Sequence, residues 1–176
     1  LKPPIEIEEA CIPWRWLRFE AITASSGNGQ FRGGLGTHCE YLNEHRSETY
    51  KAGDSLVQTG NSNGEKFASA GLMGGTGGKK SLMWIKRKGK SRILHTLDIV
   101  QSQPGDVIIT ESGGSGAVGS SVDREVDKVR WDVLNEYISA ETARKIYKVV
   151  IDPKTFEVNH EAASKLRKRT KPRLTV

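Results

Sequence analysis

Residues 82–110 read LMWIKRKGKSRILHTLDIVQSQPGDVIIT, and this stretch decides the fold class. Two runs rich in apolar and β-branched residues, 82–86 and 92–97, flank a Lys-Gly pair at 88–89, which is typical of a tight turn between antiparallel strands. A Pro-Gly-Asp turn at 104–106 then leads into another apolar run. The pattern predicts an antiparallel β-sheet.

Residues 1–111 are rich in Gly, Thr, Ser and β-forming residues on both sides of this hairpin. We expect further strands at residues 5–9, 14–23, 36–44 and 55–59 before it and at 107–110 after it. A polar, glycine-dense stretch at 60–80 has no clear period, and it predicts a long ordered loop. Loops of this length within a compact domain tend to be functional or to contact another surface, so this one is a candidate interface.

The composition changes near Ser120, and helical periodicity follows. The apolar residues Val122, Val126, Val129, Val133 and Leu134 recur at spacings that place them on one face of a helix. Two shorter helices are expected after it, at 140–147 with Ser139 as N-cap and at 160–168 with Asn159 as N-cap. A short hairpin around a turn at 152–155 separates them.

These patterns together predict an α+β fold. A mostly antiparallel β body at about residues 1–111 is followed by a small helical C-terminal part. We accordingly divide the sequence into a β-rich glycine-loop segment, 1–120, and a helical segment with a short hairpin, 121–176.

The totals fit a globular domain. The 176 residues are 36% hydrophobic and 27% charged, and the mean hydropathy is −0.51. No apolar run approaches the roughly 20 residues of a membrane-spanning helix, and the first residues lack a signal-peptide pattern. The two cysteines have no CxxC spacing, which disfavours a disulfide framework or a zinc site. We expect a cytoplasmic protein without a membrane partner.

A net charge of +6 raises the hypothesis of nucleic-acid binding. The basic residues gather at 86–92, on the expected hairpin turn, and at 165–173, on the expected last helix. Solvated surfaces explain both clusters better than a polyanion site does. We expect no nucleic-acid partner, and a basic anion- or nucleic-acid-binding module remains an alternative.

Two glycine-rich stretches could cradle an anion. Residues 26–36, SGNGQFRGGLG, are followed by a strand-like pattern and by no GxxxxGKS or GxxxxGKT motif, so a glycine-shaped strand connection is the favoured interpretation. Residues 111–119, ESGGSGAVG, precede a helix whose N-terminus could hold an anion. A tight turn that docks the helix against the sheet is favoured for this second stretch.

The four histidines offer few catalytic arrangements. Only His95 with Asp98 approaches a metal-ligand spacing, but an offset of three places the two on opposite faces of a strand. His38 shares a strand face with Glu40, whereas Cys39 faces the other way, which disfavours a Cys-His nucleophile. No GxSxG motif supports a serine hydrolase. We therefore assign no catalytic residue and no metal ligand.

Five glycine-rich or patterned segments resemble landmarks of the hydantoinase B family in the order in which that family has them. They are GNGQFRGGLG at 27–36, GLMGG at 71–75, QPGDV at 103–107, SGGSGAVG at 112–119 with DREV at 123–126, and YISAETARKIYKVVI at 137–151. The resemblance covers nearly the whole chain. The chain is similar to the C-terminal part of the hydantoinase B and acetone carboxylase alpha-subunit family, whose relatives include N-methylhydantoinase and 5-oxoprolinase.

The resemblance implies an ATP-dependent hetero-oligomeric enzyme. In such a complex a hydantoinase A-like subunit activates the substrate with ATP, and a divalent metal (Mn, Fe or Zn) serves the subunit that completes carboxylation or ring hydrolysis. The family's metal motif belongs to a region that this stretch lacks, so no ligand is carried over. TGNSNGE at 59–65 departs from the usual SDR segment and looks closer to acetone carboxylase, and Lys148 replaces a usual glycine.

The resemblance thus implies a C-terminal portion or small subunit of an acetone carboxylase-like, ketone-carboxylating complex. We expect a scaffold and interface role and no activity of the isolated chain. The alternative is part of an ATP-dependent hydantoinase or 5-oxoprolinase, which hydrolyses a lactam amide. We expect the substrate or interface loop to involve Asn61, Asn63, Glu65, Gly113, Gly114 and Gly116.

Overall fold

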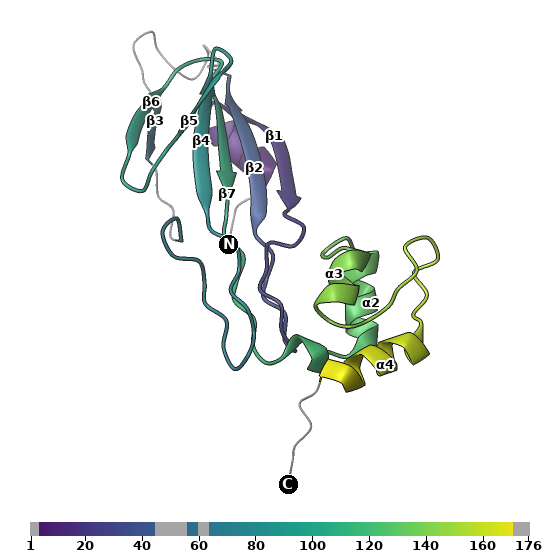
Figure 1. The fold of residues 1–176 in the computed structure, drawn as a ribbon. Coiled ribbons are helices and arrows are strands. Elements are labelled where there is room, and N and C mark those ends of the chain that lie inside the picture. The colour runs from purple at the N-terminus through teal and green to yellow at the C-terminus, as the bar shows by residue number, and fades with distance from the viewer. Residues whose placement is uncertain (1–3, 45–55, 60–63, 171–176) are drawn as a thin grey trace. The chain divides into compact units, whose positions relative to one another are not determined.

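The computed structural model describes residues 4–44, 56–59 and 64–170, shown in Figure 1. Judged by their contacts, the residues group into two compact units, each built from three separate segments. The first unit draws on Leu1–Ala21, Thr37–Phe67 and Lys80–Gly113, and the second on Ile22–Gly36, Ala68–Lys79 and Gly114–Val176. Our division of the sequence at residue 120 concerns continuous segments and stays a prediction.

The first unit is built around an antiparallel sheet, which confirms the predicted fold class. Its strands lie in the order β1-β2-β7-β4-β5, and β3 pairs with β6 in a second, two-stranded sheet. The bounds are β1 (Trp14–Ala21), β2 (Thr37–Asn43), β3 (Leu56–Thr59), β4 (Leu82–Arg87), β5 (Lys90–Ile93), β6 (Ile99–Ser102) and β7 (Val107–Glu111). One face of the main sheet buries the core of this unit, which contains Trp14, Met83, Ile85, Leu94, Val100 and Ile108.

The predicted hairpin at the Lys-Gly pair is confirmed. Arg87 pairs directly with Lys90, so the turn holds only two residues. Both of them, Lys88 and Gly89, have positive φ angles of 47° and 75°, as a two-residue turn between twisted strands requires. The second strand therefore begins at Lys90 and ends at Ile93, earlier than the expected 92–97.

One expectation for this unit was wrong, and one of its strands was missed. Residues 5–9 form part of helix α1 (Ile5–Cys11) and not a strand, because acidic residues near a helix N-terminus and strong helix formers outweigh the alternation of Ile5 and Ile7. Carboxylates of the helix fix it to β1: Glu8 accepts a hydrogen bond from Trp16 Nε1 at 3.1 Å, and Glu9 accepts one from Trp16 N at 2.7 Å. Strand β6 was not predicted at all.

The second unit carries the helices α2 (Val126–Leu134), α3 (Ala140–Lys145) and α4 (His160–Thr170), with a 3₁₀ turn, η1, at Ser121–Asp123. Their core is apolar and consists of Val129, Val133, Ile138, Ala143, Tyr147, Val149 and Ile151. Both predicted N-caps are confirmed, since Ser139 Oγ accepts from Thr142 N at 3.1 Å and Asn159 Oδ1 accepts from Ala162 N at 2.9 Å.

The predicted apolar helix face is confirmed only in part. Val129 and Val133 are buried, but Leu134 is 48% exposed and lies off that face. The helix also begins at Val126, because the preceding residues form the 3₁₀ turn and then extended backbone at Arg124. Across the described residues, no helix has the length and apolar character needed to cross a bilayer.

Candidate functional site

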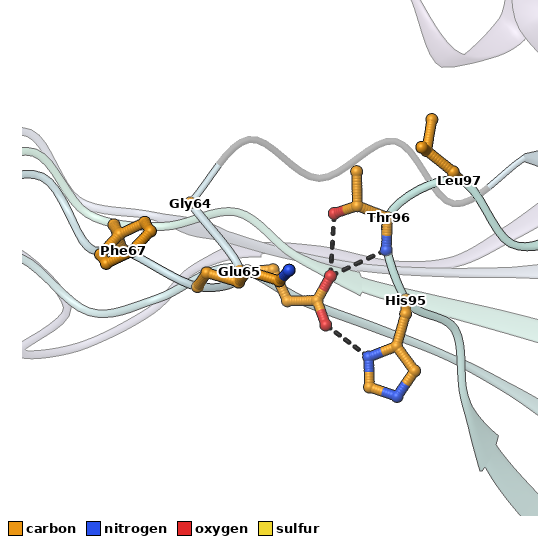
Figure 2. A pocket seen from close by; sticks show the side chains of 7 residues that line it. Gly64, Glu65, Phe67, His95, Thr96 and Leu97 are labelled. Carbon is orange, nitrogen blue, oxygen red and sulfur yellow. Dashed lines mark hydrogen bonds and ion pairs between the residues drawn. The ribbon is translucent and has the colours of Figure 1, made fainter.

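Glu65 and His95 meet at an open pocket of about 540 Å³ in the first unit (Figure 2). Gly64, Lys66, Phe67, Thr96 and Leu97 complete its lining. The two partners come from different parts of the chain. Glu65 belongs to the glycine-dense loop, and His95 follows strand β5.

Glu65 is held by three hydrogen bonds. Its Oε1 lies 2.5 Å from His95 Nδ1, and its Oε2 accepts from both the backbone N and the Oγ1 of Thr96, each at 2.8 Å. The bond to His95, followed by the two bonds from Thr96, lowers the pKa of Glu65 to about 2. The same bond and the charge of Glu65 raise the pKa of His95.

This geometry gives His95 a defined chemistry. An ionised carboxylate only accepts hydrogen bonds, so Nδ1 of His95 carries the hydrogen and donates it to Glu65 Oε1. The His95 side chain is 67% exposed, whereas that of Glu65 is 16% exposed. An imidazole fixed at Nδ1 by a carboxylate can donate or accept a proton, or bind an anion, through Nε2.

His95 and Asp98 are linked through the backbone, and the expectation that they are not paired metal ligands stays a prediction. Asp98 Oδ2 accepts a hydrogen bond from the backbone N of His95 at 3.1 Å and lies 3.5 Å from Arg92 Nη2. Asp98 therefore closes a turn. Within residues 4–44, 56–59 and 64–170, no group of three or more His, Cys, Asp or Glu side chains is arranged to hold a metal ion.

The predicted site residues separate into three groups. Asn61 and Asn63 lie outside the described residues. Glu65 lines the pocket, and Gly113 is connected to the same loop through Ser81, whose Oγ accepts from Gly113 N at 3.1 Å and whose N donates to Gly64 O at 3.2 Å. Gly114 and Gly116 belong to the second unit and play a different part there.

Three glycine-rich segments of the second unit, 25–36, 69–78 and 114–119, pack backbone against backbone. We call them the glycine interlock. A Cβ on Gly116 would lie 1.8 Å from Ala70 O, and one on Gly114 would lie 2.0 Å from Ser25 O. Gly27 and Gly33 are similarly confined, with carbonyl oxygens at 2.1 Å. The interlock confirms that residues 26–36 are a glycine-shaped strand connection.

Residues 111–119 are neither an anion-binding loop nor the tight turn that we expected. Most N–H groups of residues 112–119 donate to carbonyls or hydroxyls of neighbouring segments. Ser115 N donates to Gly34 O at 2.9 Å, for example, and Ala117 N donates to Thr76 O at 3.0 Å. These donors point to different neighbours, so they do not converge on one anion.

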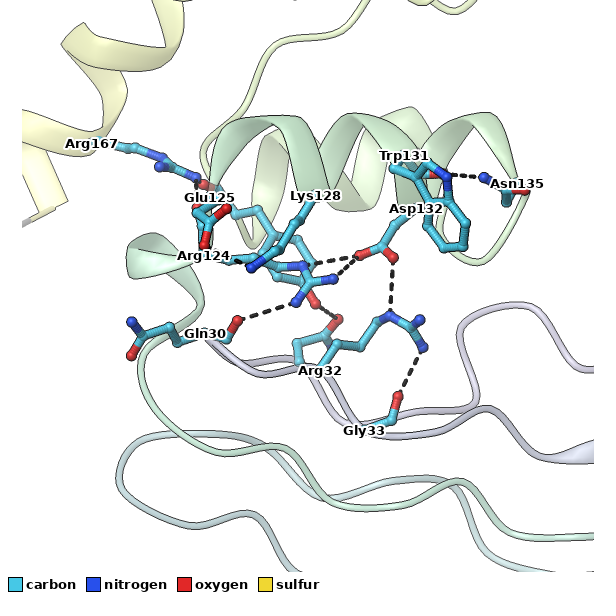
Figure 3. A network of polar contacts seen from close by, with 12 residues as sticks. Gln30, Arg32, Gly33, Arg124, Glu125, Lys128, Trp131, Asp132, Asn135 and Arg167 are labelled. Carbon is cyan, nitrogen blue, oxygen red and sulfur yellow. Dashed lines mark hydrogen bonds and ion pairs between the residues drawn. The ribbon is translucent and has the colours of Figure 1, made fainter.

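A buried charge network, shown in Figure 3, ties the interlock to α2 in the second unit. Asp132 is fully buried and accepts from Arg32 Nε at 3.2 Å and from Arg124 Nε at 3.0 Å. Arg124 also donates to Gln30 O at 3.1 Å, and Arg167 donates to Arg124 O at 2.7 Å. This network was not predicted from the sequence, although Arg32 and Arg124 lie within two of the quoted landmarks.

His38 occupies a second polar cluster, on the main sheet. Its Nε2 lies 2.9 Å from Glu40 Oε1 and its Nδ1 lies 3.0 Å from Glu111 Oε1. The predicted sharing of a face by His38 and Glu40 is confirmed, and Cys39 is buried on the other face.

Several residues of the two basic clusters are engaged within the chain. Arg87 donates to both carboxylate oxygens of Asp106, with the shortest distance 2.6 Å. Lys165 pairs with Glu161 at 2.5 Å. These pairs place part of the positive charge beside carboxylates, and the expected absence of a nucleic-acid partner stays a prediction.

Comparison with known proteins places these features in a family. Residues 1–121 match the family model described as hydantoinase B/oxoprolinase. The chain is 31% identical to the beta subunit of the caprolactamase of Pseudomonas jessenii, over 84% of this chain and 25% of that protein. It is 28% identical to the B-type subunit of a putative D-/L-hydantoinase of Pseudomonas sp. (strain NS671), over 94% of this chain and 27% of that protein.

A protein of Methanocaldococcus jannaschii is 29% identical, over 95% of this chain and 28% of its own length. Two solved structures share the fold. Nucleotide-free acetone carboxylase has a TM-score of 0.71 at 18% identity, over 95% of this chain and 26% of its own. The ATP-dependent caprolactamase of Pseudomonas jessenii has a TM-score of 0.72 at 24% identity, over 96% of this chain and 28% of its own.

The chain thus spans about a quarter of the length of the curated relatives that it matches. The family match over residues 1–121 covers more than half of the chain, and it includes the first three quoted landmarks and the glycine-rich part of the fourth. The chain belongs to the hydantoinase B/oxoprolinase family.

Proposed function

We propose that this chain is one part of the B-type subunit of an ATP-dependent complex that opens a cyclic amide, either a hydantoin or a lactam. The observation that carries this proposal is its similarity, across 84% and 94% of the chain, to the beta subunit of a caprolactamase and the B-type subunit of a putative hydantoinase. The likeness to acetone carboxylase, at 18% identity, is a likeness of fold.

Ketone carboxylation is the second candidate. The stretch 59–65 favours it, since it resembles acetone carboxylase more than the hydantoinases. In both cases we propose that a hydantoinase A-like partner subunit uses ATP. The divalent metal (Mn, Fe or Zn) would be held by residues outside this chain.

Within such a complex, the proposed role of this chain is that of a scaffold with an interface loop. Two features support a scaffold: the backbone packing of the glycine interlock and the internal pairing of Asp132 with Arg32 and Arg124. Glu65, whose three hydrogen bonds fix one end of the pocket, is the proposed anchor of the substrate or interface loop that would also contain Asn61 and Asn63.

The test is an assay of the whole complex, purified with its ATP-using subunit. Each of 5-oxoproline, hydantoin and caprolactam is supplied with ATP, and ring opening and ADP release are measured. A parallel reaction supplies acetone, ATP and labelled bicarbonate. We expect ATP-dependent ring opening without incorporation of label. Label incorporation without ring opening would establish the second candidate, and neither activity would refute both.

A further inference from the structure

The glycine interlock presents an exposed apolar patch. Phe31, Leu72, Met73 and Val118 form it, with exposed fractions of 62%, 63%, 85% and 36%. Each of the three interlocked segments supplies at least one of these residues, although the segments lie far apart in the sequence. All four residues belong to the second unit.

Backbone pairing brings three of these side chains together. Phe31 and Val118 exchange two hydrogen bonds, with N···O distances of 2.9 and 3.0 Å. Leu72 bridges the other edge of the same segment, since Leu72 N donates to Ala117 O at 2.9 Å and Gly119 N donates to Leu72 O at 3.0 Å. Partners in such bridges project their side chains to the same side. Val118 therefore lies between Phe31 and Leu72.

The backbone beneath the patch is tightly constrained. A Cβ on Gly75 would lie 2.3 Å from Ala117 O, and one on Gly29 would lie 2.8 Å from Val118 O. Met73 has a φ of 50°, a left-handed conformation that non-glycine residues rarely adopt. The close approach of these segments fixes their register, and with it the position of the exposed side chains.

The chemistry of the patch indicates a permanent partner. Its four members carry no charge, and the side chain next to Gly119 is the uncharged Gln30. Permanent interfaces are more apolar than transient ones and resemble a domain core that has been divided in two. An exposed apolar patch on a constrained backbone marks such a contact surface.

We propose that Phe31, Leu72, Met73 and Val118 pack against the remaining part of a family-length B-type subunit, the roughly three quarters of the relatives' length that this chain does not span. The proposal rests on the proposed function only in taking this chain to be part of a B-type subunit. The partner surface is apolar and belongs to the same polypeptide, not to the ATP-using subunit or to a second copy.

Cysteine labelling in the assembled complex tests whether the patch is covered. Met73→Cys is compared with Lys154→Cys, a matched control on the exposed turn near residue 154, both in a Cys11→Ser background because Cys11 is itself exposed. Maleimide incorporation at each site is followed by peptide mass spectrometry, before and after unfolding in urea. We expect labelling at position 73 to be at least about tenfold slower than at 154 in the native complex, and equal after unfolding.

Equal native rates at the two positions would overturn the proposal. Leu72→Cys serves as a second reporter, so that a folding defect at position 73 does not decide the result. Neither readout requires enzymatic activity. A complex that protects position 73 but opens no cyclic amide refutes the proposed function alone, and an active complex with an unprotected patch refutes this inference alone.

A photo-crosslinking residue in place of Phe31 identifies the occupant. We expect its crosslinks, mapped by mass spectrometry in the assembled complex, to fall on the same polypeptide outside residues 1–176. Crosslinks that fall on the ATP-using subunit, on a second copy of this chain or on no protein at all would each overturn the assignment.

Discussion

At the scale of single residues, His38 shows how two carboxylates offset the effect of partial burial. Its side chain is 13% exposed, and this desolvation alone would lower the pKa of His38. Hydrogen bonds and charges from Glu40 and Glu111 outweigh it, so the pKa is raised above 6.5. The bond to His38 in turn lowers the pKa of Glu40 below 4.5, with smaller contributions from Lys86 and Arg18.

These shifts predict a pH window for stability. Because the pKa of folded His38 is raised, its contribution is fully present below pH 6.5 and is lost as the pH rises through the folded value. The contribution of Glu40 is present above pH 4.5 and is lost as the pH falls through its lowered value. The cluster should therefore stabilise the sheet most between these two limits.

We predict that His38→Gln lowers the free energy of unfolding by about 1 kcal/mol near pH 5.5, and by much less near pH 9. Urea unfolding at the two pH values measures the difference. Lys154→Gln, a change at an exposed residue, corrects for general effects of pH. A loss on His38→Gln that is the same at both pH values would show that the cluster acts through packing alone.

At the scale of elements, the sequence predicted those strands and helix caps that are determined by residues close together in the chain. Strands β2, β4 and β7 and both N-caps were predicted because alternation, turn residues and capping residues are local signals. The strand predicted at residues 5–9 was wrong, because the isoleucines of helix α1 alternate as they would in a strand. The contacts of this helix to Trp16 cannot be seen in the sequence. Strand β6 was missed although its four residues resemble those of β3 in composition, because only its pairing with the distant β3 marks it as a strand.

The glycine interlock shows the limit of such prediction. Glycine content predicted that residues 26–36 connect two strands, but it could not identify what the glycines face. Gly33 faces Ser115 O and Gly27 faces Thr76 O, both far along the chain. Only the structure reveals that these glycines permit backbones to touch.

Gly116→Ala tests this packing. Its Cβ would lie 1.8 Å from Ala70 O, a backbone atom that can shift only if the interlock opens. We expect a loss of about 3 kcal/mol in the free energy of unfolding, measured in urea. Gly34→Ala is the matched control, because the nearest atom to its Cβ is Ser115 Oγ at 3.6 Å, and it should change stability by less than about 0.5 kcal/mol. Similar losses for both variants would contradict the packing argument.

At the scale of the whole molecule, each unit is assembled from segments that the chain separates widely. The candidate site is an example, since Glu65 was predicted from the loop but its partner His95 lies thirty residues further on. In the sequence, only the nearby Asp98 stands out as a possible partner of His95, because spacing along the chain relates only near neighbours. In the second unit, the pairing of Arg32 with Asp132 spans 100 residues and had no local signal.

Asp132→Ala tests how much the second unit depends on that long-range pairing. The side chains of Arg32 and Arg124 are only 14% and 10% exposed, so removal of the carboxylate would leave two nearly buried cations without a counter-charge. Breaking a buried ion pair from one side costs about 3–5 kcal/mol. We expect a loss of that size in the free energy of unfolding, measured in urea, with faster hydrogen exchange in Val126–Leu134.

Glu125→Ala is the control for Asp132→Ala, because the Glu125 side chain is 70% exposed and pairs with Lys128 at the surface. Such surface pairs contribute about 0–1 kcal/mol. If the two variants unfolded at the same urea concentration, Asp132 would not be what secures α2 to the interlock.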